Sequence, residues 1–554
     1  MTAGRMEAAP VLAGLLAVVA AVILLGYPLA HVLINAFTLN GQEPSLANLT
    51  LRNFERFAIS LSYQRAFWNS VVSSGGATLL ATALALPMAY AVARVEISWR
   101  PLVLALSVIP LIAPPFIGAY AWIMLLGNNG MITQTVAGLF GIKLPSIYGA
   151  FGVVVALALS YFPYVFLIVQ GALAAADPAI EEAAAMTGAS AGRVLRTITF
   201  PMIAPAVGAG MLLVFIKALG DFGVPSILGG EYQVLPTLIY YQIHGFFNLN
   251  TGSAIAIVNL ALTVLGLAVL SAISRRQVAT LSGTARATRL TNLPARSAAN
   301  AFIWVVLVLA LLPQAVVLLY SFAERWGDTL LPSVYGLGNY RSVLGEALTT
   351  TWNTVLLAGA ATAACLVFGT ITAYATVRGK AVARWALDLT IMLPFVLPGL
   401  VVGVAYLSAF NDPPFVLTGT AAILVFAYFT RRVAFIFRSA ASAIGQVDSK
   451  LEEVSAVCGA SWAETMRRVM VPLIGPALIA GGVLVFATLV GEISATVLLY
   501  SANWKTISIA IYELVNSNDL AKASALGSLC NAFTLIVVLV ASGLLGRNMS
   551  EMFR

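Results

Sequence analysis

The 554-residue sequence is 60% hydrophobic and only 9% charged, and its mean hydropathy is +0.94. Ordinary soluble domains are about 25% charged, so this composition excludes a soluble globule and indicates a polytopic membrane protein. The formal net charge of +8 is dispersed over short loops rather than gathered on one domain, which argues against nucleic-acid binding.

A membrane-spanning helix needs about 20 mostly apolar residues, and twelve segments meet that requirement, six in each half of the chain. We therefore expect an all-α polytopic membrane protein with about twelve transmembrane helices. The first segment is too long for a signal-peptide core and lacks a small-residue cleavage site, so we expect it to be retained. The segments are 11–36, 70–93, 101–126, 147–170, 203–228, 252–274, 300–322, 351–377, 386–409, 417–437, 473–499 and 521–546.

The second and third segments recur in the second half of the chain at a shift of 284 residues. The six-helix unit therefore occurs twice with the same topology, as a parallel rather than an inverted repeat. The aligned pairs include Trp68 and Trp352, Tyr90 and Tyr374, Arg94 and Arg378, Pro110 and Pro394, and Pro114 and Pro398.

Four of these aligned residues are prolines inside predicted helices: Pro110, Pro114, Pro394 and Pro398. Each proline removes a backbone hydrogen bond and can kink its helix. In a bilayer the freed carbonyl groups need protein or water partners, so such prolines either line a cavity or only shape the packing. We treat them as candidates for the substrate path.

A polar, charged stretch interrupts the apolar sequence at 177–205 and recurs, without a gap, at 448–476. Each copy predicts a short helix, a turn and a second helix outside the bilayer. Asp177 can cap the first helix, and Glu181 and Glu182 place negative charge at the positive end of its dipole. Gly188 permits a tight turn or a close backbone approach.

The first stretch resembles the EAA loop of the membrane permeases of binding-protein-dependent ABC importers through Glu182-Ala183-Ala184, Gly188, Ile198 and Pro201. The second stretch keeps the spacing and departs at the two alanines, with Glu453-Val454-Ser455, Gly459, Val469 and Pro472. In that family the loop contains the coupling helix, which docks on a cytoplasmic ATPase. The resemblance implies the type I ABC importer permease fold, and it implies ATPase-coupling roles for Glu182, Ala183, Ala184, Gly188, Glu453 and Gly459.

An aligned pair of acidic residues, Asp221 and Glu492, ends the helix that follows each loop. Ionisable groups at membrane depth are costly and by default indicate a substrate or ion route. Paired carboxylates could attract a cationic substrate, and their hard oxygen atoms suit transient contact with a hard cation such as ferric iron. The alternative is that both residues lie near the outer surface and cap helix ends in water.

Residues 275–298 are polar, basic and rich in turn-forming residues, and they predict a cytoplasmic linker between a first repeat over 1–274 and a second over 299–554. Basic residues concentrate in the loops after even-numbered helices, although Arg52, Arg56 and Arg65 fall in the first outer loop. This balance predicts that both termini and both EAA-like loops face the cytoplasm of a prokaryotic cell, with the chain in the inner membrane.

Motifs for catalysis or resident metals do not occur in the sequence. Cys365, Cys458 and Cys530 lack paired spacing, and His31 and His244 are isolated. The sequence contains no G-x-x-x-x-G-K-[ST] phosphate loop, no HExxH and no CxxC. We therefore expect a non-enzymatic chain without catalytic residues or a cofactor of its own, so that ATP and Mg²⁺ would bind to a separate ATPase.

The resemblance implies a permease subunit that forms the translocation path of an ATP-driven importer by alternating access. Its partners would be two copies of a cytoplasmic ATPase, an external or periplasmic substrate-binding protein and membrane lipid, but no nucleic acid. The two-copy layout, with GDFGVPSILGG in the first half and GEISATVLL in the second, looks most like ferric-iron permeases. Related permeases carry thiamine, aminoethylphosphonate, sulfate or polyamines, and these substrates stay open.

Two other classes of protein predict different features. A secondary transporter driven by an ion gradient would work without an ATPase, and it gives no reason for two duplicated cytoplasmic loops. A membrane-embedded scaffold or enzyme would require a cluster of catalytic or binding side chains, which the sequence does not show.

Overall fold

The computed structural model describes residues 22–42, 46–177, 179–274, 293–325, 331–379 and 396–545. It also describes residues 14, 18–20, 391 and 394. Apart from one two-stranded hairpin, the regular elements of these residues are helices. The predicted linker 275–298 lies mostly outside the described residues, and its last six residues belong to a helix that begins at Leu293.

The first half contains thirteen α-helices in the described residues. They are α2 (Tyr27–Ala36), α3 (Arg52–Ile59), α4 (Leu61–Arg94), α5 (Arg100–Ile112), α6 (Pro115–Leu126), α7 (Met131–Phe140), α8 (Ala150–Ala175), α9 (Ala179–Met186), α10 (Ala191–Val194), α11 (Phe200–Leu219), α12 (Gly223–Leu228), α13 (Leu235–Tyr240) and α14 (Leu249–Ser274). π-Helical turns lie at Val22–Gly26, Leu195–Thr199 and Tyr241–Gly245, and a 3₁₀ turn lies at Leu46–Asn48.

The second half repeats most of this order. Its described elements are α15 (Leu293–Ser321), β1 (Ala323–Arg325), β2 (Val334–Tyr335), α16 (Gly338–Arg378), α18 (Gly399–Phe410), α19 (Ala421–Gln446), α20 (Lys450–Val457), α21 (Trp462–Thr465), α22 (Val471–Val490), α23 (Thr496–Leu499), α24 (Ile507–Asn516) and α25 (Leu520–Leu545). A π-helical turn lies at Met466–Met470 and a 3₁₀ turn at Ala502–Trp504. The strands β1 and β2 pair antiparallel.

The membrane-spanning helices agree with the expected all-α class, but several differ from the predicted segments. In the described ranges nine helices are long and apolar enough to span a bilayer, or ten if one bent pair counts as a single span. The predicted segment 417–437 corresponds to α19, whose apolar sequence is interrupted by arginines. The predicted segment 386–409 falls across a gap in the description and ends in the short helix α18.

The prediction that Pro114 and Pro398 lie inside helices is wrong, because Pro114 lies between α5 and α6 and Pro398 directly precedes the first residue of α18. A residue that precedes a proline is pushed out of the α conformation. Ala113, Pro114 and Leu397 each directly precede a proline. Pro114 and Pro398 adopt ψ values of 128° and 146°. In the first half the resulting bend between α5 and the following helices is 96°.

A second pair of breaks shortens the predicted segments 203–228 and 473–499. The helix α11 ends at Leu219 and α22 ends at Val490, and short helices follow after Asp221 and Glu492. A glycine followed by a carboxylate therefore ends a helix in each half, and among the described residues a proline separates α5 from α6 and precedes α18.

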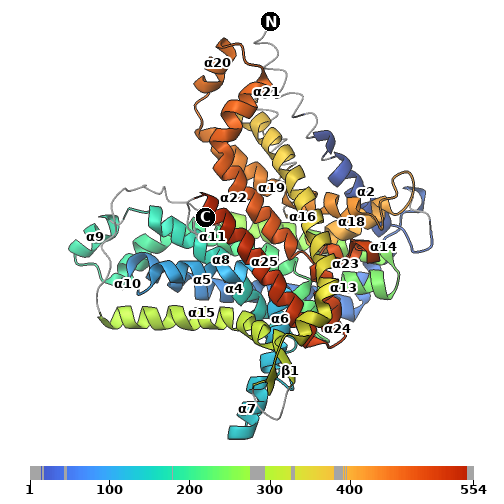
Figure 1. Cartoon of the computed structure of the whole chain (residues 1–554), viewed down its shortest axis with the longest axis horizontal. Coiled ribbons are helices and arrows are strands. Elements are labelled where there is room, and N and C mark those ends of the chain that lie inside the picture. The colour runs from blue at the N-terminus through green and yellow to red at the C-terminus, as the bar shows by residue number, and fades with distance from the viewer. Residues whose placement is uncertain are drawn as a thin grey trace.

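Figure 1 shows two arms that diverge from a common centre. The first arm, formed by α4, α5, α8 and α11, ends at α9, and the second arm, formed by α16, α19 and α22, ends at α20. The first helix of each half crosses to the other half: α2 packs against α18, and α15 packs against α6. This exchange ties the two halves together.

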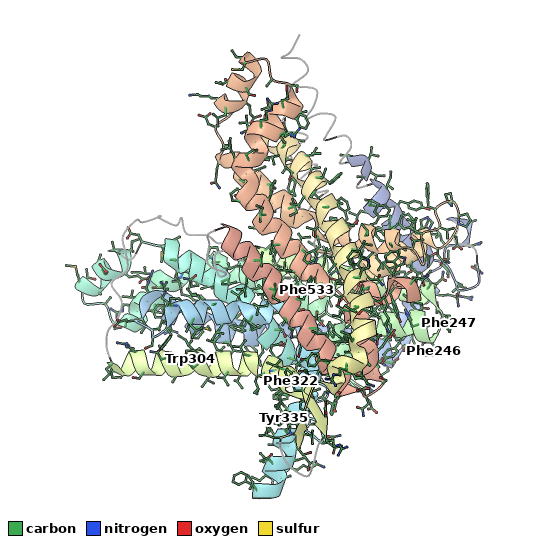
Figure 2. All side chains as sticks on the ribbon, viewed as in Figure 1. Phe246, Phe247, Trp304, Phe322, Tyr335 and Phe533 are labelled. Carbon is green, nitrogen blue, oxygen red and sulfur yellow. The ribbon has the colours of Figure 1, made fainter. Side chains whose placement is uncertain are left out.

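The outer surface of the helices is apolar. Val305 and Val308 on α15 and Ile536 and Val540 on α25 are each 57% exposed, and Figure 2 shows Trp304 and Phe533 on the same two helices. Exposed apolar area of this extent is unfavourable in water and matches a surface covered by lipid chains.

Candidate functional site

Both EAA-like loops begin with the same helix cap. The Asp177 Oδ1 atom accepts a hydrogen bond from the Ala179 N–H at 3.0 Å, and the Asp448 Oδ1 atom accepts one from the Lys450 N–H at 3.0 Å. These bonds satisfy backbone donors that the first turn of α9 or α20 leaves free.

Both loops also end their first helix in the same way. Gly188 and Gly459 adopt φ values of +85° and +82°, and each donates a backbone hydrogen bond to the carbonyl three residues earlier. The next N–H, of Ala189 or Ala460, bonds to the carbonyl five residues earlier. This is a Schellman cap, in which glycine is favoured because its conformation is left-handed. No other atom lies within 4 Å of a Cβ built on either glycine, so the tight turn, not a close approach, requires it.

A duplicated ion pair attaches each loop to the membrane helices. The Arg94 Nε atom, at the end of α4, lies 2.8 Å from the Glu181 Oε2 atom in α9, and Thr199 donates to the same carboxylate. In the second half the Arg378 Nε atom lies 2.7 Å from the Glu452 Oε1 atom, and Tyr374 donates to that carboxylate.

The predicted coupling residues Glu182, Ala183 and Glu453 are exposed, and Ala184 is half-buried. The glutamate that holds each loop is the preceding one, Glu181 or Glu452, which the prediction did not assign to coupling. Beside the exposed glutamates, Met186 and Val457 occupy equivalent positions and are 89% and 88% exposed. Each short helix thus presents a carboxylate and an apolar side chain outward.

A continuous helical path connects each loop with the centre of the molecule. In the first half it runs from α10 through the π-helical turn Leu195–Thr199 into α11, and in the second from α21 through Met466–Met470 into α22. Pro201 and Pro472 follow the π turns, where the wider turn accommodates a ring that lacks an N–H donor. The paths end at Gly220-Asp221 and Gly491-Glu492.

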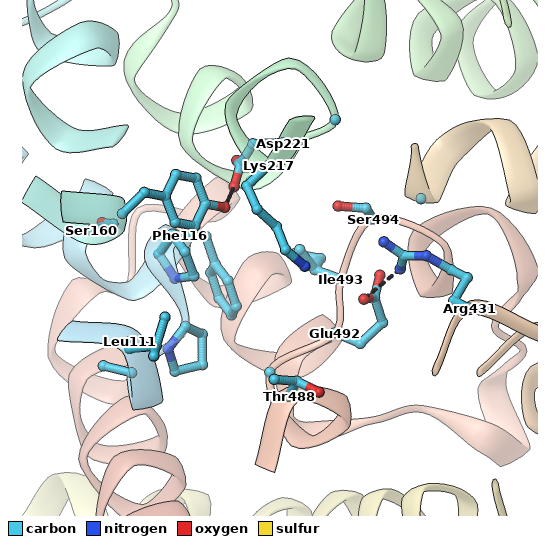
Figure 3. Close-up of a pocket in the computed structure, with 18 of the residues that line it drawn as sticks. Leu111, Phe116, Ser160, Lys217, Asp221, Arg431, Thr488, Glu492, Ile493 and Ser494 are labelled. Carbon is cyan, nitrogen blue, oxygen red and sulfur yellow. Dashed lines mark hydrogen bonds and ion pairs between the residues drawn. The ribbon is translucent and has the colours of Figure 1, made fainter. Parts of the chain in front are cut away.

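At that centre lies a cavity of about 130 Å³, walled by both halves (Figure 3). Its lining includes Pro110, Pro114 and Pro398 from the proline breaks, and Asp221 and Glu492 from the glycine breaks. The structure therefore brings together five of the six predicted substrate-path residues. The sixth, Pro394, lines a separate small cavity with Phe368 and Phe429.

The two carboxylates are buried, with exposed fractions of 9% for Asp221 and 6% for Glu492. The alternative placed them at helix ends in water. They are not exposed to water, but each does cap a helical turn. The Asp221 Oδ1 atom accepts from the Val224 N–H at 2.8 Å, and the Glu492 Oε1 atom accepts from the Ala495 N–H at 3.0 Å.

The remaining carboxylate oxygens have different partners in the two halves. The Asp221 Oδ2 atom accepts a hydrogen bond from the Tyr161 hydroxyl at 2.6 Å. The Glu492 Oε2 atom lies 2.5 Å from Arg431 Nη1 and 3.1 Å from Arg432 Nη2. Tyr161 and Arg432 occupy equivalent positions in α8 and α19, so the same site in each copy holds a neutral partner in one and a cation in the other.

Lys217, one helical turn before Asp221, also lines the cavity. Figure 3 shows its side chain extended from α11 towards Ile493 and Glu492 of the other half. The equivalent residue in α22 is Thr488. Sequence reasoning missed Lys217, Arg431 and Arg432; the signal that could have revealed them is a charged side chain inside an apolar segment.

The two halves meet around the cavity through two equivalent glycine–proline contacts. A Cβ atom added to Gly491 would lie 2.6 Å from Pro114 Cγ, and one added to Gly220 would lie 3.4 Å from Pro398 Cα. The glycine of each half therefore packs on the helix-breaking proline, Pro114 or Pro398, of the other half. The absence of a side chain permits this close approach.

Within the described residues, no cysteine or histidine lines the central cavity. Cys365 and Cys530 are buried and Cys458 is exposed, all as free thiols. His31 packs on Tyr27, and His244 stacks on Tyr240 with ring centroids 4.6 Å apart. Burial lowers the pKa of His244. Within the described ranges, no three His, Cys, Asp or Glu side chains converge as a metal site would require.

These features define a class of protein: a two-copy membrane permease with paired loops and a central cavity between the copies. The family model of the binding-protein-dependent transport system inner membrane component matches the chain twice, at residues 77–279 and 365–551. The chain belongs to this family, and it is thus a multi-pass inner-membrane component of an ABC importer.

Relatives support the two-copy layout. The ferric transport system permease protein FbpB of Actinobacillus pleuropneumoniae is 31% identical over 492 residues, covering 86% of this chain and 70% of the relative. A putative ferric transport system permease protein FbpB 1 of Haemophilus influenzae is 30% identical, covering 80% and 72%. The putative 2-aminoethylphosphonate transport system permease protein PhnV of Salmonella typhi is 30% identical, covering 42% of this chain and 89% of the relative. That relative therefore corresponds to about one copy.

The Schellman glycines generate a first prediction. Gly188→Ala combined with Gly459→Ala should weaken binding of the partner ATPase, because a left-handed alanine costs about 1–2 kcal/mol at each site. The affinity of the ATPase for the permease in lipid nanodiscs measures this effect. Gly192→Ala is the matched control, since Gly192 lies in α10 with no atom within 4 Å of an added Cβ and no positive φ. Equal ATPase affinities for the control and the double variant would contradict the assignment of the two loops as ATPase docking sites.

The duplicated ion pair generates a second prediction. Arg94 and Glu181 side chains are only 7% and 13% exposed, and removing one partner of a buried pair costs about 3–5 kcal/mol. Arg94→Met should therefore release α9, increase hydrogen exchange over residues 179–186 and lower transport per ATP hydrolysed. Glu182→Gln, in the same helix but exposed, should leave hydrogen exchange unchanged. If both variants behave alike, the ion pair does not hold the loop.

The contacts between the halves generate a third prediction. Gly491→Ala should lower the melting temperature and the transport rate, because its Cβ would overlap Pro114 and overpacking costs about 1–3 kcal/mol. Gly220→Ala should have a smaller effect, since its Cβ would reach Pro398 at ordinary contact distance. Thermal unfolding of the purified complexes compares the two, and an equal or reversed order would refute this account of the interface.

Proposed function

We propose that this chain forms the translocation path for ferric iron in an ABC importer. The observation that carries the proposal is its similarity to ferric permeases over most of its length. The cavity at the meeting of the two copies supports it, because its volume of about 130 Å³ suits a small cargo. Sites for drug-sized ligands occupy roughly 300–1,000 Å³, so this volume favours an ion over thiamine or a polyamine.

The carboxylates supply the chemistry for a transient contact with a metal cargo. Asp221 and Tyr161 place hard oxygen atoms at one wall of the cavity, and hard oxygen ligands suit hard cations. Glu492 is already paired with two arginines, so it contributes little free negative charge. The sequence suggested that both carboxylates attract a cation. In this proposal only Asp221 has that role.

ATP would be hydrolysed, with Mg²⁺, by two copies of a separate cytoplasmic ATPase that dock on α9 and α20. The exposed side chains of both helices, Glu182 with Met186 and Glu453 with Val457, support this assignment. Because each loop continues as a helix to the cavity, closure of the ATPase pair would draw the arms together and alter the cavity. The divergence of the arms in Figure 1 fits a state open towards the loops. In this proposal the loops and both termini face the cytoplasm.

A phosphonate is the second candidate cargo. It is supported by the 2-aminoethylphosphonate permease relative and by the basic side chains that line the cavity. The substrate-binding protein that delivers either cargo would dock on the face opposite the EAA-like loops.

Uptake by proteoliposomes tests this proposal and is the fourth prediction. The chain is reconstituted with its ATPase and its iron-loaded binding protein, with ATP on the side of the loops. We expect accumulation of ⁵⁵Fe that requires ATP and stops when a Walker-site variant replaces the ATPase. ATP hydrolysis that the binding protein stimulates without ⁵⁵Fe uptake would exclude iron as the cargo, but it would still support an ATP-driven importer. Uptake driven by an ion gradient without ATPase would refute the ATP-driven mechanism.

A further inference from the structure

The charges of the central cavity do not match a site for a bare cation. Within the described residues, its lining contains three basic side chains, Lys217, Arg431 and Arg432, but only two acidic ones, Asp221 and Glu492. A trivalent ion would add to this positive excess in a largely buried site. Uncompensated charge in a low-dielectric environment is strongly unfavourable.

One basic side chain also has hydrogen-bonding capacity left over. Arg432 is buried, with an exposed fraction of 6%. Its Nη2 atom binds Glu492, but its Nε–H donor has no hydrogen-bond partner among the described residues. A buried donor without an acceptor costs free energy that an incoming acceptor recovers.

The basic side chains approach the cavity from both halves. Lys217 extends from α11 of the first half, whereas Arg431 and Arg432 come from α19 of the second. Their equivalents in the other copies are Thr488, Ser160 and Tyr161, which also line the cavity and are uncharged. The excess of positive charge is therefore a property of the assembled pair, not of either copy.

We infer that the central cavity contains an oxyanion subsite formed by Lys217, Arg431 and Arg432, so that the cargo enters with a phosphate-like or carboxylate-like group. This inference rests on the proposed importer function and refines its substrate class. Guanidinium and ammonium groups form charge-assisted hydrogen bonds with such oxyanions. The oxyanion either accompanies ferric iron as its counter-ion or belongs to a phosphonate cargo. In both cases it offsets the surplus positive charge of the lining.

Binding of inorganic phosphate to the permease–ATPase complex in nanodiscs tests the subsite. We expect [³²P]phosphate to bind, and Lys217→Met to weaken binding about tenfold or more, as loss of a charge-assisted hydrogen bond implies. Lys217→Arg should retain most of the affinity, which separates loss of charge from misfolding. Lys143→Met, which removes a positive charge from an exposed loop, should leave binding unchanged. Equal binding by the wild type and Lys217→Met overturns the inference.

Dual-label uptake distinguishes the two sources of the oxyanion. Proteoliposomes receive the binding protein loaded with ⁵⁵Fe in phosphate or in chloride buffer, or radiolabelled 2-aminoethylphosphonate without iron. Iron uptake accompanied by ³²P and reduced in Lys217→Met supports the counter-ion. Phosphonate uptake that is reduced in Lys217→Met, together with no ⁵⁵Fe uptake in either iron-loaded sample, supports the subsite and excludes iron as the cargo. Iron uptake that needs no oxyanion and is unchanged in Lys217→Met overturns the subsite but leaves the iron importer intact.

Discussion

The contact between Gly491 and Pro114, with its counterpart between Gly220 and Pro398, determines how the two halves of this permease meet. In each pair a residue without a side chain lies against a proline that has broken a helix. Both contacts lie beside the carboxylate that lines the cavity, since Asp221 and Glu492 directly follow the glycines. The geometry of the cavity therefore depends on a backbone approach that a single added carbon would obstruct at Gly491.

The same two breaks lie at the cavity end of the helices that lead from the EAA-like loops. α11 and α22 each continue from a π-helical turn to a glycine break, so one continuous helix joins each loop to the cavity. The ion pairs of Arg94 and Arg378 attach the loops to α4 and α16, which belong to the same arms. Each arm is thus a packed unit, and the two arms join where the glycine and proline breaks meet.

The repeat in the sequence was sufficient to predict the loops, the proline pair Pro114 and Pro398 and the carboxylate pair, because aligned residues in two copies identify positions without any structure. Their spatial convergence was not predictable, since it depends on contacts between the two copies. Arg431 and Arg432 fall near the end of the predicted segment 417–437, where basic residues usually mark the cytoplasmic side of a helix. They lie instead near the middle of α19, which extends to Gln446, well past the predicted end at 437. The helix ends expected at Asp221 and Glu492 are confirmed, but the predicted segments 203–228 and 473–499 run past them because apolar sequence resumes after each carboxylate.

Some features are common to the two copies and others differ, and the division fits the proposed function. The loop caps, the arginine–glutamate pairs, the π turns and the glycine–proline contacts occur in both halves. Two identical ATPase subunits would require such equivalent docking sites. The side chains around the carboxylates have diverged: Tyr161 corresponds to Arg432, Ser160 to Arg431 and Lys217 to Thr488. A single cargo in the proposed cavity would contact the walls of both copies at once, so nothing requires the two walls to be alike. Fusion of the copies into one chain makes this asymmetry available, because each wall can then change without changing the other.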